Sequence, residues 1–302
     1  MGVLENKVVA VTGAGRGIGR SIALDAARAG ANVVVADYGV GIDGREPSSD
    51  VADAVVGEIE DLGGKAIAVA GDVGTMAGGE SIVEAAMDTW GRIDGAVCVA
   101  GILRERMLFN MSEEEFDEVV RVHLKGTFTV YRAASAVMRK QEGGGSLIGF
   151  TSGVWALGSI SQPNYSAAKG GIVSLTYSAA AGLDRYGVRA NCIAPVARTR
   201  MSANVPTSLA ENGEPEDISP MAVYLLSDDA KGITGQVFTV VGNRIGIWNQ
   251  PSEQRSMSTD ARWTTEDIAA RLPDALGTER LPMLDMVEKA RAAAAAGDRP
   301  NQ

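Results

Sequence analysis

Several residue types are scarce in this chain of 302 residues, and each scarcity argues against a class of protein. Its two cysteines, Cys98 and Cys192, both lie in apolar strand-like runs, so we expect reduced core thiols rather than a disulfide framework. A nucleophilic cysteine needs a base such as histidine beside it, and His123 is the only histidine. Cysteine catalysis is therefore not expected, and neither is a metal site.

Other absences concern location and partners. No apolar run approaches the roughly 18 residues of a membrane span. The N-terminal stretch MGVLENKVVAVTGAG lacks the basic region and cleavage site of a signal peptide. The net charge of −10 argues against binding to nucleic acid or to an anionic membrane. The sequence thus predicts a cytoplasmic protein with a small-molecule substrate.

Short apolar stretches alternate with longer alanine-rich stretches that have helical periodicity. In GIGRSIALDAARAG, for example, Ile18, Ile22 and Ala26 share one helical face, and Gly30 supplies a stop signal. The strand-like runs are apolar throughout, which is typical of a parallel sheet covered by helices on both faces. The alternation predicts an α/β protein with a doubly wound parallel sheet, the Rossmann fold. The predicted strands are residues 7–12, 32–37, 65–71, 95–101, 146–151, 188–194 and 236–241.

This alternation stops near residue 245, which predicts a single domain over residues 1–245 and a C-terminal extension over 246–302. Within the extension, a capping threonine with an acid three residues on predicts a helix over 264–272, and a proline-to-glycine segment predicts another over 282–297. Three roles remain open for the extension: covering a neighbouring subunit's active site, binding part of a substrate, or fraying.

The segment VTGAGRGIGR joins the first predicted strand to the first predicted helix. Its glycines permit a tight turn and a close backbone approach, and the helix N-terminus offers N–H donors to a pyrophosphate. The second predicted strand ends in Asp37, 18 residues after Gly19, where a carboxylate accepts hydrogen bonds from ribose hydroxyls and repels a 2′-phosphate. These features predict binding of NAD rather than NADP. Arg16 is a weaker counter-signal, because it can either meet a phosphate or stay solvated.

The segment NYSAAKG places Tyr165 four residues before Lys169, so on a helix the two side chains share a face. A cation beside a phenol favours the phenolate and lowers a pKa that is otherwise about 10. Tyr165 is therefore a candidate general acid and base.

The order of these motifs resembles that of the short-chain dehydrogenase/reductase family over residues 5–245. The family's TGxxxGxG fingerprint is matched by Thr12, Gly13, Gly17 and Gly19. Its Asn-Asn-Ala-Gly sequence is matched only in its second half, since residues 98–101 read Cys-Val-Ala-Gly. Its Pro-Gly-x-x-x-Thr segment along the nicotinamide is matched by Pro195 and Thr199, although Val196 replaces the glycine.

The resemblance implies a role for each catalytic candidate. Tyr165 exchanges a proton with the substrate, and Lys169 holds the nicotinamide ribose and lowers the pKa of the tyrosine. Ser152, thirteen residues before Tyr165, polarises the substrate oxygen. Hydride transfer to a carbonyl builds an alkoxide, which needs a hydrogen-bond donor and a proton source. The residues expected at the dinucleotide are Gly13, Arg16, Gly17, Ile18, Gly19, Asp37, Asp72, Val73, Ala100, Gly101, Tyr165, Lys169, Pro195 and Thr199.

His123 departs from the commonest family pattern, because most members carry an asparagine there that helps to hold a proton-relay water. An imidazole can hold such a water too, and it adds a group that ordinarily titrates near pH 6.5. The alternative is a hydrogen-bonded helix histidine with a structural role. Both interpretations stay open on the sequence alone.

Local phrases such as QPNYSAAKGGI and APVARTRM resemble a branch of the family, the hydroxyacyl-CoA dehydrogenase unit of multifunctional enzyme type 2 and its bacterial single-domain relatives. This branch implies an NAD(H)-dependent oxidoreductase for 3-hydroxyacyl-CoA or steroid-like substrates. Two alternatives are a general carbonyl reductase or sugar- or terpenoid-alcohol dehydrogenase of the same family, and a non-catalytic dinucleotide sensor. Substrate identity, stereochemistry and direction are not given by the sequence.

Three further expectations concern the surroundings of the site. Four arginines at the expected rim can meet the phosphates of coenzyme A or form a solvated rim; they are Arg104, Arg106, Arg198 and Arg200. Residues 201–219 are expected to form a substrate lid. The resemblance also implies a homo-tetramer or homodimer assembled through the long helices that hold residues 112–139 and 163–185.

Overall fold

The computed structural model describes residues 2–40, 48–198 and 213–295. The chain divides into two compact units, Met1–Trp248 and Asn249–Gln302. Within the described residues, no helix combines the length and the apolar character needed to cross a membrane.

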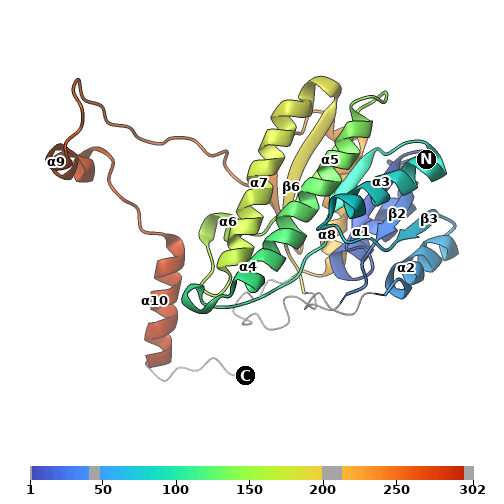
Figure 1. Cartoon of the computed structure of the whole chain (residues 1–302), viewed down its shortest axis with the longest axis horizontal. Coiled ribbons are helices and arrows are strands. Elements are labelled where there is room, and N and C mark those ends of the chain that lie inside the picture. Colours follow the sequence, from blue (N-terminus) through green and yellow to red (C-terminus); the bar gives the residue numbers. More distant parts are fainter. Residues whose placement is uncertain (1, 41–47, 199–212, 296–302) are drawn as a thin grey trace. The chain divides into compact units, whose positions relative to one another are not determined.

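The first unit is built on one sheet with the strand order β3-β2-β1-β4-β5-β6-β7-β8 (Figure 1). Seven parallel strands confirm the predicted Rossmann fold, and each predicted strand agrees within three residues at its ends. The prediction lacks β8, an antiparallel edge strand that crosses residue 245. The strands are β1 Val8–Thr12, β2 Asn32–Ala36, β3 Lys65–Val69, β4 Gly95–Cys98, β5 Gly145–Phe150, β6 Val188–Val196, β7 Val237–Val241 and β8 Arg244–Ile247.

Helices cover both faces of this sheet, and the central strands β1, β2 and β4 are mostly apolar and almost entirely buried. The α1 and α8 helices pack together on one face, and α3, α5 and α7 cover the other (Figure 1). The helices of this unit are α1 Gly17–Arg28, α2 Asp50–Asp61, α3 Met76–Trp90, α4 Glu113–Val120, α5 Gly126–Met138, α6 Val154–Leu157, α7 Pro163–Leu183 and α8 Pro215–Leu226, with short 3-10 turns at Leu108–Asn110, Asp184–Tyr186 and Asp228–Ala230.

The helix that runs from α4 into α5 contains one turn of π-helix, Arg121–Lys125, which carries His123. A π turn holds one more residue than an α turn and often marks a functional site. Ser112 begins α4 with a capping box in which its side chain accepts from the backbone N–H of Glu115.

The expected lid over 201–219 is wrong in its last part. Residues 201–212 lie outside the described part of the chain, but Pro215 already begins α8, and Ile218 is fully buried in the core. The helix start has a clear signal, a capping box between Glu214 and Asp217 with proline at the first turn. This segment is therefore a fixed structural helix and not a mobile cover.

In the second unit, α9 Thr265–Ala275 and α10 Pro282–Ala295 confirm the two helices predicted there. Thr264 caps α9, and its side chain accepts from the backbone N–H of Asp267, as the sequence pattern predicts.

Both cysteines are buried and free, as expected. Cys98 on β4 and Cys192 on β6 both pair with Gly149 on β5, so a whole strand separates them. That spacing is about 10 Å, beyond the roughly 7 Å that a disulfide can bridge. Burial raises the pKa of both thiols, that of Cys192 to about 12, so neither is a ready nucleophile.

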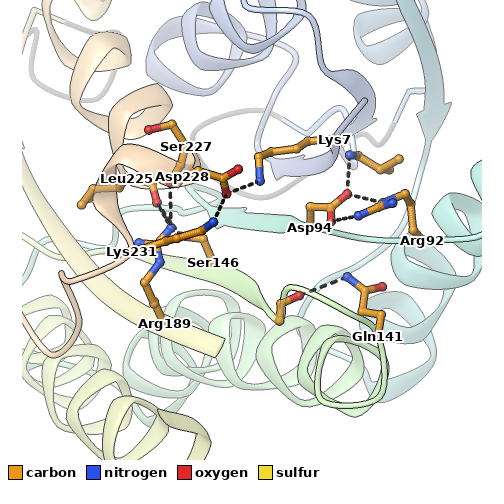
Figure 2. Close-up of polar contacts among 12 residues, drawn as sticks. Lys7, Arg92, Asp94, Gln141, Ser146, Arg189, Leu225, Ser227, Asp228 and Lys231 are labelled. Atoms are coloured by element: carbon orange, nitrogen blue, oxygen red, sulfur yellow. Dashed lines mark hydrogen bonds and ion pairs between the residues drawn. The ribbon is translucent and has the colours of Figure 1, made fainter. Parts of the chain in front are cut away.

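A polar network ties the amino ends of the strands to the end of α8 (Figure 2). Arg189, at the start of β6, donates hydrogen bonds to the carbonyl oxygens of Leu225 (2.7 Å) and Ser227 (3.2 Å). These carbonyls belong to the unpaired C-terminal end of α8, so the guanidinium caps the helix. Lys7, just before β1, pairs with Asp228 at 2.9 Å, and a cavity of about 450 Å³ opens between these groups.

Candidate active site

The carboxyl ends of the parallel strands meet at the opposite edge of the sheet, and most of the predicted site residues gather there. The glycine loop follows β1, Asp37 follows β2, Asp72 follows β3, Gly101 follows β4 and Ser152 follows β5. In open α/β sheets this edge is where ligands bind.

Glycines shape the loop after β1 by close backbone approaches. A Cβ on Gly13, whose φ is 65°, would lie 2.9 Å from the backbone of Ala100, and one on Gly19 would lie 2.1 Å from the carbonyl oxygen of Gly13. Arg16 is exposed at the N-cap of α1, and Ile18 packs partly against the core. The loop therefore forms a cradle of backbone at a helix N-terminus, which fits a pyrophosphate.

Asp37 lies beside this cradle. One of its carboxylate oxygens accepts from the backbone N–H of Gly15 at 2.8 Å and the other from that of Gly39 at 2.7 Å. Two backbone donors thus fix the carboxylate next to the loop, where each oxygen retains a lone pair for a ribose hydroxyl.

Asp72 and Val73 follow β3 at the same edge of the sheet. Asp72 pairs with Arg121 of the π turn at 2.6 Å, and it also accepts from the backbone N–H of Gly74 at 2.9 Å. The carbonyl of Val73 accepts from the Thr129 hydroxyl at 2.6 Å. Asp72 and the carbonyl of Val73 are therefore braced against the helix that carries His123.

At the end of β4, Thr12 Oγ1 accepts from the backbone N–H groups of Val99 (3.1 Å) and Ala100 (3.2 Å). This explains the threonine of the fingerprint, which joins the ends of β1 and β4. A Cβ on Gly101 would lie 2.1 Å from Cε1 of His123, so only glycine leaves room for the imidazole there.

Ser152, Tyr165 and Lys169 are brought together, as the spacing predicts. The Ser152 hydroxyl is hydrogen-bonded to the Tyr165 phenol, and Lys169 Nζ lies 5.3 Å from the centre of the tyrosine ring. Lys169 is 4% exposed, and its ammonium donates to the carbonyl of Phe150 at 2.5 Å. Ser152 follows β5, the strand beside β4, and the helix α7 that carries Tyr165 and Lys169 packs against β5 and β6.

The expected lowering of the tyrosine pKa is not found in the structure. Burial raises the pKa of Tyr165 to about 12, and the hydrogen bond from Ser152 only partly opposes it. Burial also lowers the pKa of Lys169 to about 7, which weakens the ammonium as a source of positive charge. The sequence pattern places the two groups correctly but contains no information on how deeply each is buried.

His123 is 2% exposed, and its Nε2 lies 2.8 Å from the carbonyl oxygen of Ile102. Burial and the nearby Lys169 lower its pKa well below the ordinary value, so the imidazole is neutral. Nε2 also lies 3.2 Å from the backbone nitrogen of Ile102, and among the described residues the buried Nδ1 has no hydrogen-bond partner. The ring packs edge to face against Tyr165, with centroids 5.1 Å apart.

Some predicted residues contribute less to the described site. Pro195 lies near the end of β6, whereas Thr199 and Arg200 lie outside the described residues. At the arginine rim, Arg106 pairs with Glu115 at 2.9 Å and Arg198 with Glu214. Those two rim arginines are thus already engaged, as the solvated-rim alternative expects.

Several supporting residues escape the sequence analysis. The Thr151 hydroxyl donates to the carbonyl of Lys169 at 2.9 Å, and the fully buried Asn164 bonds to the backbone of Tyr165. Trp155 and Trp248 pack edge to face with centroids 5.4 Å apart, beside the Ser152 loop. Thr151 and Asn164 adjoin catalytic candidates in sequence, and that adjacency is the one signal that points to them.

Known proteins of similar sequence and structure agree with this geometry. A family model described as enoyl-(acyl carrier protein) reductase matches residues 13–242. Hydroxyacyl-CoA dehydrogenase ChsB1 of Mycobacterium tuberculosis is 42% identical over 90% of this chain and 89% of its own length. The peroxisomal multifunctional enzyme type 2 of Mus musculus is 41% identical over 80% of this chain, which corresponds to 32% of that longer protein.

A crystal structure of a short-chain dehydrogenase from Mycobacterium avium matches with a TM-score of 0.84 and 43% identity, over 92% of this chain and 97% of that one. A Rossmann fold with a serine, tyrosine and lysine at the carboxyl edge of its sheet defines a dinucleotide-dependent oxidoreductase. The chain belongs to the short-chain dehydrogenase/reductase family.

Proposed function

We propose that the chain oxidises the secondary alcohol of a 3-hydroxyacyl-CoA or a steroid-like substrate to a ketone, with NAD as the cofactor. The observation that carries this proposal is the hydrogen bond between Ser152 and Tyr165. Tyr165 lies on α7, the helix that also holds Lys169, and Ser152 and the glycine loop both lie at the carboxyl edge of the sheet. The substrate class is supported by a relative named hydroxyacyl-CoA dehydrogenase at 42% identity.

In this mechanism Ser152 donates a hydrogen bond to the substrate oxygen, and Tyr165 takes the alcohol proton in oxidation or returns it in reduction. A bound nicotinamide dinucleotide supplies hydride exchange, and Gly13, Gly19 and Asp37 hold it. With a pKa of about 12, the Tyr165 phenol is protonated at neutral pH and suits proton donation to a carbonyl. For oxidation the phenol must lose its proton, and a charged Lys169 favours that loss.

The choice of NAD over NADP rests on Asp37. Its carboxylate is fixed by two backbone N–H groups, so it cannot swing away to make room for a 2′-phosphate without leaving both donors unpaired. Among the described residues, the exposed Arg16 of the same glycine loop is the cation that favours the opposite choice.

For His123 we favour the relay role over a purely structural one. Among the described residues, the buried Nδ1 has no hydrogen-bond partner, and an ordered water commonly satisfies such a buried ring nitrogen. A water at Nδ1 that also contacts Lys169 would extend the proton path beyond the phenol.

Two rival functions would use parts of the same site. A carbonyl reductase or a sugar- or terpenoid-alcohol dehydrogenase has the same three catalytic side chains, and the engaged rim arginines Arg106 and Arg198 offer no free cation to coenzyme A. A dinucleotide sensor needs the cradle alone, and this chain would then have no use for the Ser152–Tyr165 pair.

The discriminating experiment compares NADH formation from 3-hydroxyacyl-CoA esters with that from free secondary alcohols. We expect turnover of the thioesters, and we expect Tyr165→Phe to lose it by about 10²–10⁴-fold while still binding NADH. Tyr177→Phe, about three turns along the same helix, is the matched control and should keep its activity. Turnover of free alcohols alone supports the first rival, and NADH binding without turnover supports the sensor.

We also propose that a second copy of the chain packs against the exposed face of α4 and α5. Phe116 and Phe128 are 40% and 43% exposed. Twelve residues of α-helix would place them about 120° apart, but the extra residue in the π turn takes back about 100°. The two rings therefore share one face.

This face has charges of opposite sign at its two ends. Glu113 and Asp117 lie on it in α4, and Arg132 and Arg139 lie on it in or just beyond α5, where Arg132 also pairs with Glu80 of α3. An antiparallel pairing about a twofold axis sets the acidic end of one copy against the basic end of the other, with the phenylalanines between them. The charge pattern and the exposed rings together favour a second copy as the partner.

A further inference from the structure

Asn164 is completely buried at the start of α7, and its side chain joins three segments of the chain. Its amide nitrogen donates to the carbonyl of Arg104, in the loop after β4, at 2.9 Å and to that of Glu115, in α4, at 2.8 Å. Its amide oxygen accepts from the backbone N–H of Tyr165 at 2.8 Å. This N–H is one of the first-turn donors that a helix cannot satisfy internally.

Only a carboxamide of this length suits the position. The surroundings present two acceptors and one donor, and the asparagine side chain supplies two N–H donors and one oxygen acceptor. Aspartate would set a carboxylate against two carbonyl oxygens, and alanine would remove three hydrogen bonds at a position closed to solvent. No bond here is replaced by solvent, since the side chain is 0% exposed.

Neighbouring hydrogen bonds run along the same seam. The backbone N–H of Arg106 donates to the carbonyl of Ser161 at 2.8 Å, and Gln162 donates to Glu105 at 2.5 Å. These two pairs lie at the protein surface, whereas Asn164 is the buried member of the seam. The loop after β4 is therefore joined to the start of the catalytic helix at several points.

The same loop is held from its other side by His123, which bonds to Ile102. The segment 102–104 thus lies between two buried side chains, His123 and Asn164, and both of them also contact Tyr165, the first by its ring and the second by its amide. The position of the phenol relative to this wall depends on Asn164.

We propose that Asn164 is a positioning residue that fixes Tyr165 against the segment 102–104 and so sets the reach of the phenol toward Ser152 and the substrate. This inference rests on the proposed function of Tyr165. A misplacement of about 1 Å can reduce turnover about 10²-fold, so loss of the amide should lower kcat by about 10- to 100-fold. The KM for NAD should change by less than about twofold, because the glycine cradle and Asp37 are not bonded to Asn164.

The chain offers a matched control in Asn191. It is also 0% exposed, and its side chain also bridges backbone groups, donating to Ile233 at 2.9 Å and accepting from Gln236 at 3.0 Å. It lies in β6, where it pairs with Ile148 of β5 and bonds to the segment before β7. Asn191→Ala and Asn164→Ala should both lower the melting temperature, but only Asn164→Ala should lower kcat.

A second readout does not need activity. Because His123 is the sole histidine, a chain made without a histidine tag and with labelled histidine gives the NMR signals of one imidazole, whose shifts respond to the Tyr165 ring 5.1 Å away. We expect Asn164→Ala to move these signals and Asn191→Ala to leave them in place. The isosteric Asn164→Asp, at acid pH where the carboxyl regains an O–H donor, should restore them in part and serves if the alanine variant does not fold.

Unmoved histidine signals in folded Asn164→Ala, or equal losses of kcat in Asn164→Ala and Asn191→Ala, would overturn the proposal. If the wild-type chain turns over none of the alcohols, the proposed function fails, while the histidine signals still report whether Asn164 positions Tyr165.

Discussion

The buried ammonium of Lys169 gives the protein a pH-dependent stability that can be measured. Burial lowers its pKa from 10.5 to about 7, whereas the unfolded chain exposes it. Between about pH 7 and 10.5 the unfolded chain binds a proton that the folded chain does not, so stability from this group rises with pH across that window. At about 1.36 kcal/mol per pKa unit, protonation of Lys169 opposes folding by about 4–5 kcal/mol at pH 6 and about 2 kcal/mol at pH 9.

Replacing the residue with methionine removes this dependence. Lys169→Met leaves the carbonyl of Phe150 without its donor, which costs about 1–3 kcal/mol, but that loss is the same at both pH values. The unfolding free energy of the variant relative to wild type should therefore be higher at pH 6 than at pH 9 by about 2–3 kcal/mol. Turnover should fall at both pH values, since the charge beside Tyr165 is gone.

The assay is urea unfolding of the cofactor-free protein, followed by tryptophan fluorescence at one protein concentration. Lys140→Met, an exposed residue just after α5, is the control and should shift stability equally at pH 6 and pH 9. If the Lys169→Met difference is also independent of pH, the folded chain does not penalise the charge and the reasoning from burial fails. A difference that grows toward pH 9 would reverse its sign.

Two further predictions concern the cofactor and the second copy. Asp37→Ala should abolish a preference for NADH over NADPH in fluorescence titrations, because the carboxylate that repels a 2′-phosphate is gone; a wild-type preference for NADPH would refute the assignment. Phe128→Glu should shift sedimentation toward a smaller species, because it buries a charge in the α4–α5 face. Leu62→Glu, at a residue that is 51% exposed just after α2, is the control that should leave assembly unchanged, and an unchanged sedimentation of Phe128→Glu would exclude this face.

Much of the fold is predictable because the pattern of the chain is regular. Buried parallel strands read as unbroken apolar runs, and caps such as Thr264 mark helix starts within one or two residues. The misses have physical causes. The strand Arg244–Ile247 is short and mostly exposed, so it lacks the apolar run of a buried strand, and the start of α8 lies in a polar stretch whose helix is stabilised by packing on α1.

The site is predictable in its membership and less so in its chemistry. The spacing of Ser152, Tyr165 and Lys169 is local, so one helix and one loop suffice to bring them together. The pKa values of Tyr165 and Lys169 depend on burial by segments far away in sequence, so a short motif does not predict them. The bonds of Asn164 to Arg104 and Glu115 span 60 and 49 residues, so they become visible only in three dimensions.

The network around Arg189 and Lys7 has a consequence for engineering and for evolution. It stabilises the amino ends of the strands, a full strand length away from the edge where the glycine loop, Asp37 and Ser152 lie. Substitutions in it can therefore raise or lower the resistance of the protein to heat while the catalytic edge keeps its geometry. During evolution, substitutions at one end of the sheet can change substrate specificity while substitutions at the other end change thermal stability. Because the two ends are far apart, the effects of these substitutions should be nearly additive.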